Sequence, residues 1–267
     1  MKIVFTDLDG SLLDRDTYSF EWARPALEQL RRRRIPLIIV SSKTRQEIEF
    51  WRRHLQNNHP FVVENGGAAY IPDGYFALAP PGSIHRDGYN FIQFGDLYSD
   101  LVTCLQRASL ESRCEVLGFH DMTAQEIARR CGVPLEQAQL AQQREFDEPF
   151  EVLDTARTEL LLAAIKKGGR SWTRGGRFYH VLGGNDKARA VELLSRLYRQ
   201  SHDEVVTVGL GDGLNDLQFL KQVDVPVLVR STDSERLQAE LPGACLTQSP
   251  GPSGWNQAIL ELIGVSD

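Results

Sequence analysis

The chain has 267 residues, with 30 lysines and arginines against 36 aspartates and glutamates, so its formal net charge is −6. Hydrophobic residues make up 42% and charged residues 25%, a composition typical of globular proteins that argues against a disordered or fibrous chain. The negative balance makes general binding to nucleic acid or to an anionic membrane a poor first hypothesis. The length allows either one large domain or a core with an inserted domain.

Neither the cysteines nor the apolar runs point to a zinc finger or a membrane span. The cysteines are Cys104, Cys114, Cys131 and Cys245, and none forms a CxxC pair or meets a histidine at zinc-finger spacing. No apolar run approaches the ~18 residues of a transmembrane helix, and the chain starts directly on a predicted strand. We therefore expect a cytoplasmic protein with reduced thiols.

Short apolar runs alternate with amphipathic stretches toward both ends of the chain. The runs predict strands at residues 3–5, 37–40, 61–63, 205–208 and 226–229, and the amphipathic stretches predict helices at 24–34, 44–55 and 186–199. Continuous β-branched runs separated by helices are typical of βαβ units around a buried parallel sheet. The predicted fold class is therefore α/β.

The middle of the chain has a different texture. Turn-rich stretches near 71–74, 80–82 and 87–88 precede polar, helix-prone stretches near 99–111, 123–131 and 135–144. Thr123 and Glu126 fit a capping box, and Gly132 fits a helix stop. We expect an inserted domain at 81–182 and a core formed by residues 1–80 and 183–267.

Two aspartates follow the first predicted strand. Asp7 and Asp9 stand at i and i+2, before Gly10, so their carboxylates are expected at the carboxyl end of a parallel sheet, where open α/β sheets bind ligands. Close like charges repel unless a cation lies between them. Taken alone, an ordinary turn explains the segment about equally well, because Asp-Gly is a common turn dipeptide.

A second acidic loop decides between these explanations. The strand at 205–208 runs into Gly209-Leu210-Gly211-Asp212-Gly213-Leu214-Asn215-Asp216. A dinucleotide-binding loop is rejected, because Leu214 stands where the third glycine is needed and the carboxylates would face a pyrophosphate with the wrong charge. Two carboxylate loops at strand ends suit a hard cation with oxygen ligands, most simply Mg²⁺.

Hydroxyl and amino groups near these loops are candidates for holding a phosphate. Ser41, Ser42 and Lys43 end the second predicted strand at a helix N-terminus, whose N–H groups suit an anion. Lys187 opens the helix before the second acidic loop and could neutralise a phosphoryl oxygen. Simpler explanations exist for both: a Ser/Thr N-cap for the first and a solvated surface lysine for the second.

The order of these segments resembles the four motifs of the haloacid dehalogenase superfamily of phosphohydrolases. The motifs are Asp7-x-Asp9-Gly10-Ser11, the Ser41-Ser42 strand end, Lys187, and Gly211-Asp212-(x)₃-Asp216. The insert resembles the C2-type cap of the sugar-phosphatase branch, and segments 41–45, 64–67, 175–180 and 251–255 extend the likeness over nearly the whole chain. Ser11 stands where the superfamily usually has Thr, which keeps the hydroxyl. The resemblance implies a Rossmann-like core with an inserted α+β cap of the C2B type.

The same resemblance implies a Mg²⁺-dependent phosphomonoesterase. Asp7 would be the nucleophile that forms an aspartyl-phosphate, and Asp9 would protonate the leaving alkoxide and then deprotonate the attacking water. Mg²⁺ would be held by Asp7, the Asp9 carbonyl and Asp212, with Asp216 steadying the loop or a bound water. Contacts to the phosphate would come from Gly10, Ser41 (with Ser42 as the alternative), Lys43, Lys187 and Asn215.

The substrate implied is a small anionic sugar phosphate, mannosyl-3-phosphoglycerate, with its glucosyl counterpart or a broader range of sugar phosphates as alternatives. An acidic protein needs a local basic patch for such an anion, and its candidates are Lys43, Arg45, Arg144, Arg170, Arg174 and Arg177. The residues expected to contact substrate are Arg45, Asn65, Gly66, Arg144, Asp147, Arg177, Tyr179 and His180. Simpler explanations remain for several of them: sheet packing for Tyr179, a structural role for His180, an acidic turn at Asp147 and a strand-end turn at Asn65.

Two other classes of protein fit these features less well than an enzyme does. A receiver-like signalling domain also uses a strand-end aspartate, Mg²⁺, a hydroxyl and a lysine, but such modules are small, lack a large insert and leave Asp9 without a task. A sugar-binding protein has no reason to gather four carboxylates around a metal. We expect an enzyme that acts as a monomer or homodimer, with neither nucleic acid nor membrane as a partner.

Overall fold

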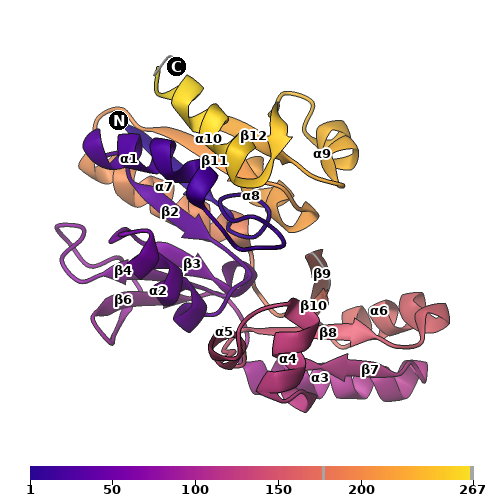
Figure 1. Cartoon of the computed structure of the whole chain (residues 1–267). Coiled ribbons are helices and arrows are strands. Elements are labelled where there is room, and N and C mark those ends of the chain that lie inside the picture. The colour runs from indigo at the N-terminus through magenta and orange to yellow at the C-terminus, as the bar shows by residue number, and fades with distance from the viewer. Residues whose placement is uncertain (176–177, 265–267) are drawn as a thin grey trace.

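The computed structural model describes residues 1–175 and 178–264, which form a larger and a smaller sheet with their helices (Figure 1). In spatial order the larger sheet consists of β13 (Cys245–Pro250), β12 (Val225–Arg230), β11 (Val206–Gly211), β1 (Lys2–Thr6), β2 (Leu37–Val40), β3 (Phe61–Val63), β4 (Ala68–Pro72), β6 (Tyr89–Gln93) and β5 (Ile84–Arg86).

Neighbouring strands from β13 through β3 all run parallel. All four residues of β2, Leu37 to Val40, are buried, because a central parallel strand is covered by helices on both faces. The predicted α/β core is thereby confirmed. Since parallel strands end at the same edge, the loops after β1, β2 and β11 meet there, at the edge that faces the smaller sheet (Figure 1).

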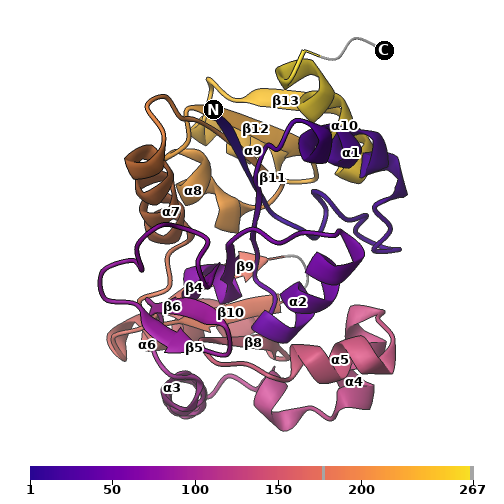
Figure 2. The ribbon, with the colours of Figure 1, turned by 90° about the vertical axis from the view of Figure 1, so that its left-hand side faces the viewer.

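Helices cover both faces of this sheet (Figure 2). On one face lie α1 (Arg24–Arg32), α2 (Arg45–His54) and α10 (Gly251–Leu262), which bury Leu27, Trp51 and Trp255. On the other face lie α7 (Lys187–Ser201), α8 (Leu217–Leu220) and α9 (Ser234–Glu240), which bury Leu194 and Phe219. The two apolar layers hold the strand ends, and the loops that follow them, in fixed positions.

The larger sheet extends further along the chain than the sequence suggests. Residues 84–93, which we assigned to the inserted domain, form β5 and β6, and β6 pairs antiparallel with β4. Phe91 of β6 is buried in the same apolar cluster as Tyr70 of β4. The turn-rich stretches near 71–88 are therefore connections at the edge of the core: residues 87–88 form the β5–β6 hairpin turn, and residues 73–83 lead from β4 to the edge strand β5. The inserted segment begins after Gln93.

The smaller sheet, with its helices, forms the cap. Its antiparallel strands are β7 (Val116–Gly118), β8 (Asp147–Val152), β10 (Phe178–Leu182) and β9 (Ser171–Gly175), in that order. One face packs against α3 (Tyr98–Ser112) and α6 (Thr158–Lys167), and α4 (Ala124–Cys131) and α5 (Leu135–Ala141) form a second apolar cluster with Phe119 and Phe178. The predicted capping box of Thr123 and Glu126 is present, and Gly132 ends α4 with φ 71°.

Candidate active site

Three aspartates gather where β1 and β11 end. Asp7 follows β1 directly, and Asp212 and Asp216 follow the neighbouring strand β11. All three are buried, and each offers a carboxylate oxygen within 4.8 Å of the other two. A buried cluster of like charges needs a cation, and carboxylate oxygens are the ligands that Mg²⁺ prefers. The donor set therefore fits Mg²⁺.

Lys187 provides a positive charge within this cluster. It opens α7, and its Nζ donates to Oδ1 of Asp7 at 3.1 Å and to Oδ1 of Asp216 at 2.6 Å. Burial alone would lower the pKa of Lys187, but Asp216 and Asp7 outweigh it and hold the pKa above its ordinary value. For Asp7, burial raises the pKa well above its usual range and Lys187 opposes that shift. The lysine is therefore a buried site residue, not a solvated one.

Asp216 and Asp212 have different surroundings. Oδ2 of Asp216 accepts the backbone N–H groups of Asp212 (3.1 Å) and Gly213 (3.0 Å), so both of its oxygens have partners within the loop and Lys187. Asp212 accepts from the Ser11 hydroxyl at 3.1 Å and from the Arg15 guanidinium at 2.5 Å. Burial, aided by Asp216, raises the pKa of Asp212 to about 7, although Arg15 opposes the shift.

The carboxylate of Asp9 lies apart from these three. Its Oδ2 pairs with Nζ of Lys43 at 2.9 Å, whereas Oδ1 is buried without a hydrogen-bond partner in the described residues. Gly10, the next residue, has φ +83°, and a Cβ there would lie 2.5 Å from Oδ2 of Asp212. Only glycine therefore lets the chain turn so tightly beside the acidic loop.

The two serines after β2 have different surroundings. Ser42 lines the cavity, whereas Ser41 is buried and its Oγ accepts the backbone N–H of Lys43 at 3.3 Å. The N-cap of α2 is Thr44, which forms a capping box with Glu47. Between the two serines, the one favoured by the sequence is Ser41, but the one on the cavity wall is Ser42.

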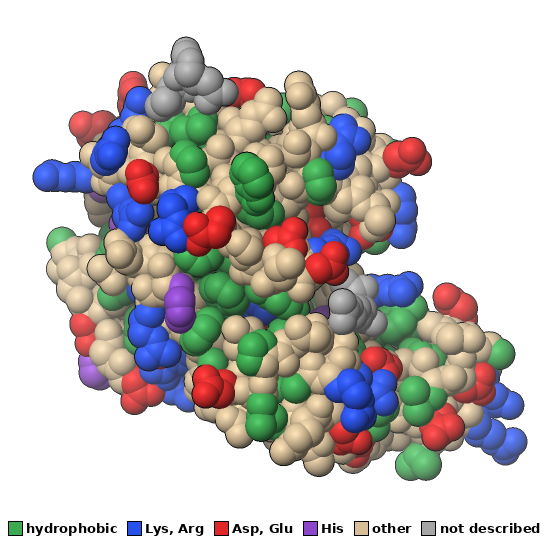
Figure 3. All heavy atoms as spheres, viewed as in Figure 1, with side chains coloured by type: hydrophobic (Ala, Val, Ile, Leu, Met, Phe, Trp, Pro, Cys, Tyr) green, Lys and Arg blue, Asp and Glu red, His purple; other side chains and the backbone are tan. Residues whose placement is uncertain are grey.

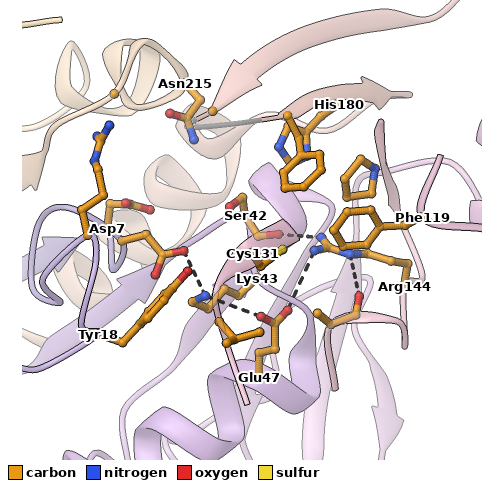
Figure 4. A pocket seen from close by; sticks show the side chains of 18 of the residues that line it. Asp7, Tyr18, Ser42, Lys43, Glu47, Phe119, Cys131, Arg144, His180 and Asn215 are labelled. Atoms are coloured by element: carbon orange, nitrogen blue, oxygen red, sulfur yellow. Dashed lines mark hydrogen bonds and ion pairs between the residues drawn. The ribbon is translucent and has the colours of Figure 1, made fainter. Parts of the chain in front are cut away.

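A cavity of about 260 Å³ lies between the core and the cap. Figure 3 shows the hollow between the two lobes, and Figure 4 shows the side chains that surround it. The core contributes Asp7, Asp9, Arg15, Tyr18, Ser42, Lys43, Glu47, Asp212, Gly213 and Asn215. The cap contributes Phe119, Cys131, Val133, Ala141, Arg144, Pro149, Gly175, Phe178 and His180. The core wall is thus charged, and much of the cap wall is apolar.

A chain of polar side chains, buried except for the half-buried Asn215, joins the acidic loop to the cap. Asn215 donates to Oδ1 of Asn65 at 3.1 Å, and Asn65 donates to Oδ2 of Asp147 at 2.6 Å. His180 donates from Nδ1 to Oδ1 of Asp147 at 2.8 Å. Burial alone would raise the pKa of Asp147, but His180, Arg144 and Asn65 together outweigh this effect and hold the pKa below its ordinary value. With Nδ1 engaged, the Nε2 edge of His180 remains for the cavity, which His180 lines.

Other predicted contact residues lie elsewhere. Arg45 pairs with Glu49 at 2.9 Å and with Asp87 at 2.7 Å. Tyr179 packs with the α3–α6 cluster, on the opposite face of the cap sheet from His180. Gly66 (φ +89°) supports the site through its backbone, because a Cβ there would meet the backbone of Asp186 at 2.3 Å. Arg177 lies outside the described residues.

The sequence interpretation missed several cavity residues. Arg15 and Tyr18 follow the first motif on an irregular loop, and Phe119 lies at the end of a cap strand. Glu47 belongs to a recognisable pattern, because Thr44-x-x-Glu47 is a capping box. That pattern predicts the start of a helix, however, and not a residue that lines a cavity. No helix in the described residues is long and apolar enough to cross a membrane.

Comparisons with known proteins show which family the chain is similar to. Residues 4–77 match the model of a haloacid dehalogenase-like hydrolase family. A glucosyl-3-phosphoglycerate/mannosyl-3-phosphoglycerate phosphatase from Methanococcoides burtonii is 42% identical over 98% of this chain and 97% of its own length. A protein of the same name from Persephonella marina is 38% identical, with the same shares covered. A haloacid dehalogenase-superfamily phosphatase structure from Bacteroides thetaiotaomicron has a TM-score of 0.68 at 19% identity, over 100% of this chain and 96% of the other. The chain therefore belongs to the haloacid dehalogenase superfamily, as an enzyme of the phosphatase family that these relatives represent.

Proposed function

We propose that the enzyme hydrolyses mannosyl-3-phosphoglycerate to mannosylglycerate and phosphate, with Mg²⁺ as cofactor and an aspartyl-phosphate on Asp7 as intermediate. The observation that carries this proposal is the buried Asp7, which accepts a hydrogen bond from Lys187 and lies beside Asp212 and Asp216. It is supported by the 42% identity to a glucosyl-3-phosphoglycerate/mannosyl-3-phosphoglycerate phosphatase. Since that relative's name includes the glucosyl substrate, glucosyl-3-phosphoglycerate is the alternative.

The first half of the reaction forms the intermediate. A carboxylate oxygen of Asp7 attacks the phosphorus in line with the bond to the glycerate oxygen, and that bond breaks as Asp9 gives its proton to the leaving alkoxide. Asp7 and Asp212, with the Asp9 carbonyl, would hold Mg²⁺, which supplies positive charge against the anionic nucleophile and phosphate. Asp216 orders the loop through the amides of residues 212 and 213.

The second half regenerates Asp7. Asp9, now a carboxylate, takes a proton from water, the water oxygen attacks the phosphorus, and the bond to Asp7 breaks to release phosphate. Lys187 donates to phosphoryl oxygens in both halves, and Ser42 and Asn215 do so from the cavity wall. The backbone of Gly10 is a further proposed contact to the phosphate. The four cysteines are free thiols, which is consistent with the cytoplasmic location that we propose for the protein.

Substrate kinetics test the proposed activity. With Mg²⁺, we expect kcat/KM for mannosyl-3-phosphoglycerate, or for its glucosyl counterpart, to exceed that for mannose 6-phosphate by about 10²-fold or more. Equal values on all these compounds would instead indicate a general sugar phosphatase. A receiver-like switch would hold the phosphoryl group on its aspartate, whereas an enzyme of this kind releases many equivalents of phosphate.

A further inference from the structure

The cavity holds a second charged group besides the acidic cluster. Lys43 and Arg144 both line it, Lys43 from the core and Arg144 from the cap, and each side chain is more than nine-tenths buried. We propose that these two cations form a carboxylate subsite that gives the enzyme its preference for glycosyl phosphates bearing a carboxylate. This inference rests on the proposed function.

The two cations lie on either side of one carboxylate. Nζ of Lys43 is 3.5 Å from Oε1 of Glu47, and Nη2 of Arg144 is 3.9 Å from Oε2 of Glu47 (Figure 4). Both separations are longer than a charge-assisted hydrogen bond of about 2.8 Å. Glu47 is meanwhile held by its own helix, since its Oε2 accepts the backbone N–H of Thr44 at 2.9 Å. Glu47 therefore lies between the two cations and holds neither of them in a close ion pair. Lys43 has a shorter pair, at 2.9 Å, with Asp9.

The donors of Arg144 are arranged for an incoming anion. Its Nε donates to the carbonyl of Ala141 at 3.0 Å and its Nη1 to the carbonyl of Ser42 at 2.8 Å, so the guanidinium is fixed by neutral partners. The Nη2 group has the 3.9 Å pair with Glu47, and the buried carboxylates of Asp147 and Glu64 also act on the guanidinium charge. A guanidinium fixed in this way is already oriented, and it loses little freedom when a carboxylate binds.

The other described cations among the candidates are committed elsewhere. Arg45 pairs with Glu49 and Asp87, Arg170 pairs with Asp96 at 2.9 Å, and the Arg174 guanidinium lies over the Tyr179 ring, on the α3–α6 face of the cap sheet. Arg15, at the cavity, pairs with Asp212. Lys43 pairs with Asp9 at 2.9 Å, the residue proposed to protonate the leaving alkoxide, so Lys43 lies where a substituent of the leaving group would extend. Arg144 lines the same cavity from the cap.

The subsite also bridges the two parts of the chain. Arg144 reaches from the cap to the Ser42 carbonyl in the core, and Thr44 in the core donates to the Leu140 carbonyl in the cap at 3.0 Å. A carboxylate held by both Lys43 and Arg144 would add a contact that exists only when core and cap are together. A substrate without that group would lack it.

A cycle of enzyme variants against paired substrates tests the subsite. The substrates are mannosyl-3-phosphoglycerate and the analogue whose carboxylate is reduced to a hydroxymethyl group, so the phosphate, the sugar and the bond that breaks stay the same. For the wild type we expect kcat/KM to favour the carboxylate by about 10²-fold, the scale of a buried charge pair. Arg144→Gln and Lys43→Gln should each reduce this preference to less than about 10-fold, and Arg144→Lys should retain more of it than Arg144→Gln.

Matched controls are Arg45→Gln in the core and Arg174→Gln in the cap, both of which should keep the wild-type preference. An unchanged preference in Arg144→Gln and Lys43→Gln would overturn the subsite while leaving the proposed function in place. If Arg144→Gln does not fold, Lys43→Gln decides the question alone. A wild type that hydrolyses neither glycosyl-3-phosphoglycerate nor the analogue would instead contradict the proposed function, and the subsite with it.

Discussion

The ammonium group of Lys187 lies 3.1 Å from the carboxylate of Asp7, which joins the first residue of α7 to the residue after β1, 180 positions away in the chain. The same ammonium donates to Asp216 at 2.6 Å. One side chain therefore holds the proposed nucleophile and the acidic loop in register, and the charge of that side chain offsets part of the local negative charge.

Removing this ammonium should damage both activity and the metal-free protein. For Lys187→Met we expect kcat to fall by about 10²-fold or more, because a donor to the reacting phosphate is lost. We also expect the free energy of unfolding without Mg²⁺ to fall by about 3 kcal/mol, because buried carboxylates lose their partner. Steady-state kinetics and urea unfolding measure the two effects. Lys221→Met, which breaks an exposed pair with Glu240, is the control and should change neither substantially.

Asp216 should act on the metal through the loop. Asp216→Asn removes a charge from Lys187 and weakens the oxygen that accepts the amides of Asp212 and Gly213. Loss of such a supporting group typically weakens metal binding 10–100-fold, so we expect the Mg²⁺ concentration for half-maximal activity to rise by about 10-fold or more. The exposed Asp203→Asn is the control. An unaltered Mg²⁺ requirement in Asp216→Asn would show that the loop is ordered by other contacts.

Glycine at position 10 allows a close approach that a methyl group would block. A Cβ in Gly10→Ala would lie 2.5 Å from Oδ2 of Asp212, so we expect kcat/KM to fall by about 10²-fold as Asp212 is displaced. Gly82→Ala separates this effect from backbone strain, because Gly82 also has positive φ (+77°) but has open space where the Cβ would be. Equal activities in the two variants would contradict the steric explanation.

The pair of Asp147 and His180 predicts a pH dependence of stability. The pKa of Asp147 is lowered in the folded protein, so its carboxylate stabilises the fold above the ordinary aspartate pKa, and that stabilisation is lost as the pH falls through the folded-state value. We therefore expect Asp147→Asn to be less stable than the wild type by about 3 kcal/mol at pH 7, with the difference shrinking below about pH 4. Urea unfolding at several pH values measures this. A difference that stays constant with pH would mean that Asp147 contributes by shape alone.

How far the sequence predicts this protein depends on the kind of feature. The core strands and the positions of Asp7, Asp212 and Lys187 follow from it, because apolar runs set the parallel sheet and polar residues at strand ends then meet at one edge. For the cap strand 178–182, the sequence does not predict which face lines the cavity, because period-two alternation allows either Tyr179 or His180 to face it. The packing of Tyr179 against α3 and α6 leaves His180 on the cavity face.

Two further features depend on long-range packing. The turn-rich sequence around the edge strands β5 and β6 led us to assign them to the inserted domain, because local turn signals do not indicate which sheet a hairpin joins. Tyr18 and Phe119 reach the cavity from an irregular loop and from the cap, and nothing in their local pattern marks them. Local sequence motifs thus predict the reacting groups, whereas tertiary packing determines which other residues line the cavity.

The most direct test of the central claim is to locate the covalent intermediate. Wild-type enzyme, mixed with Mg²⁺ and mannosyl-3-phosphoglycerate and quenched with acid within the first turnover, is treated with borohydride, which reduces an acyl phosphate to an alcohol, and is then mapped by peptide mass spectrometry. We predict homoserine at position 7, and none there in Asp7→Asn or without substrate. Reduction at another aspartate, or no reduction while phosphate is being released, would contradict the assignment of Asp7 as the nucleophile.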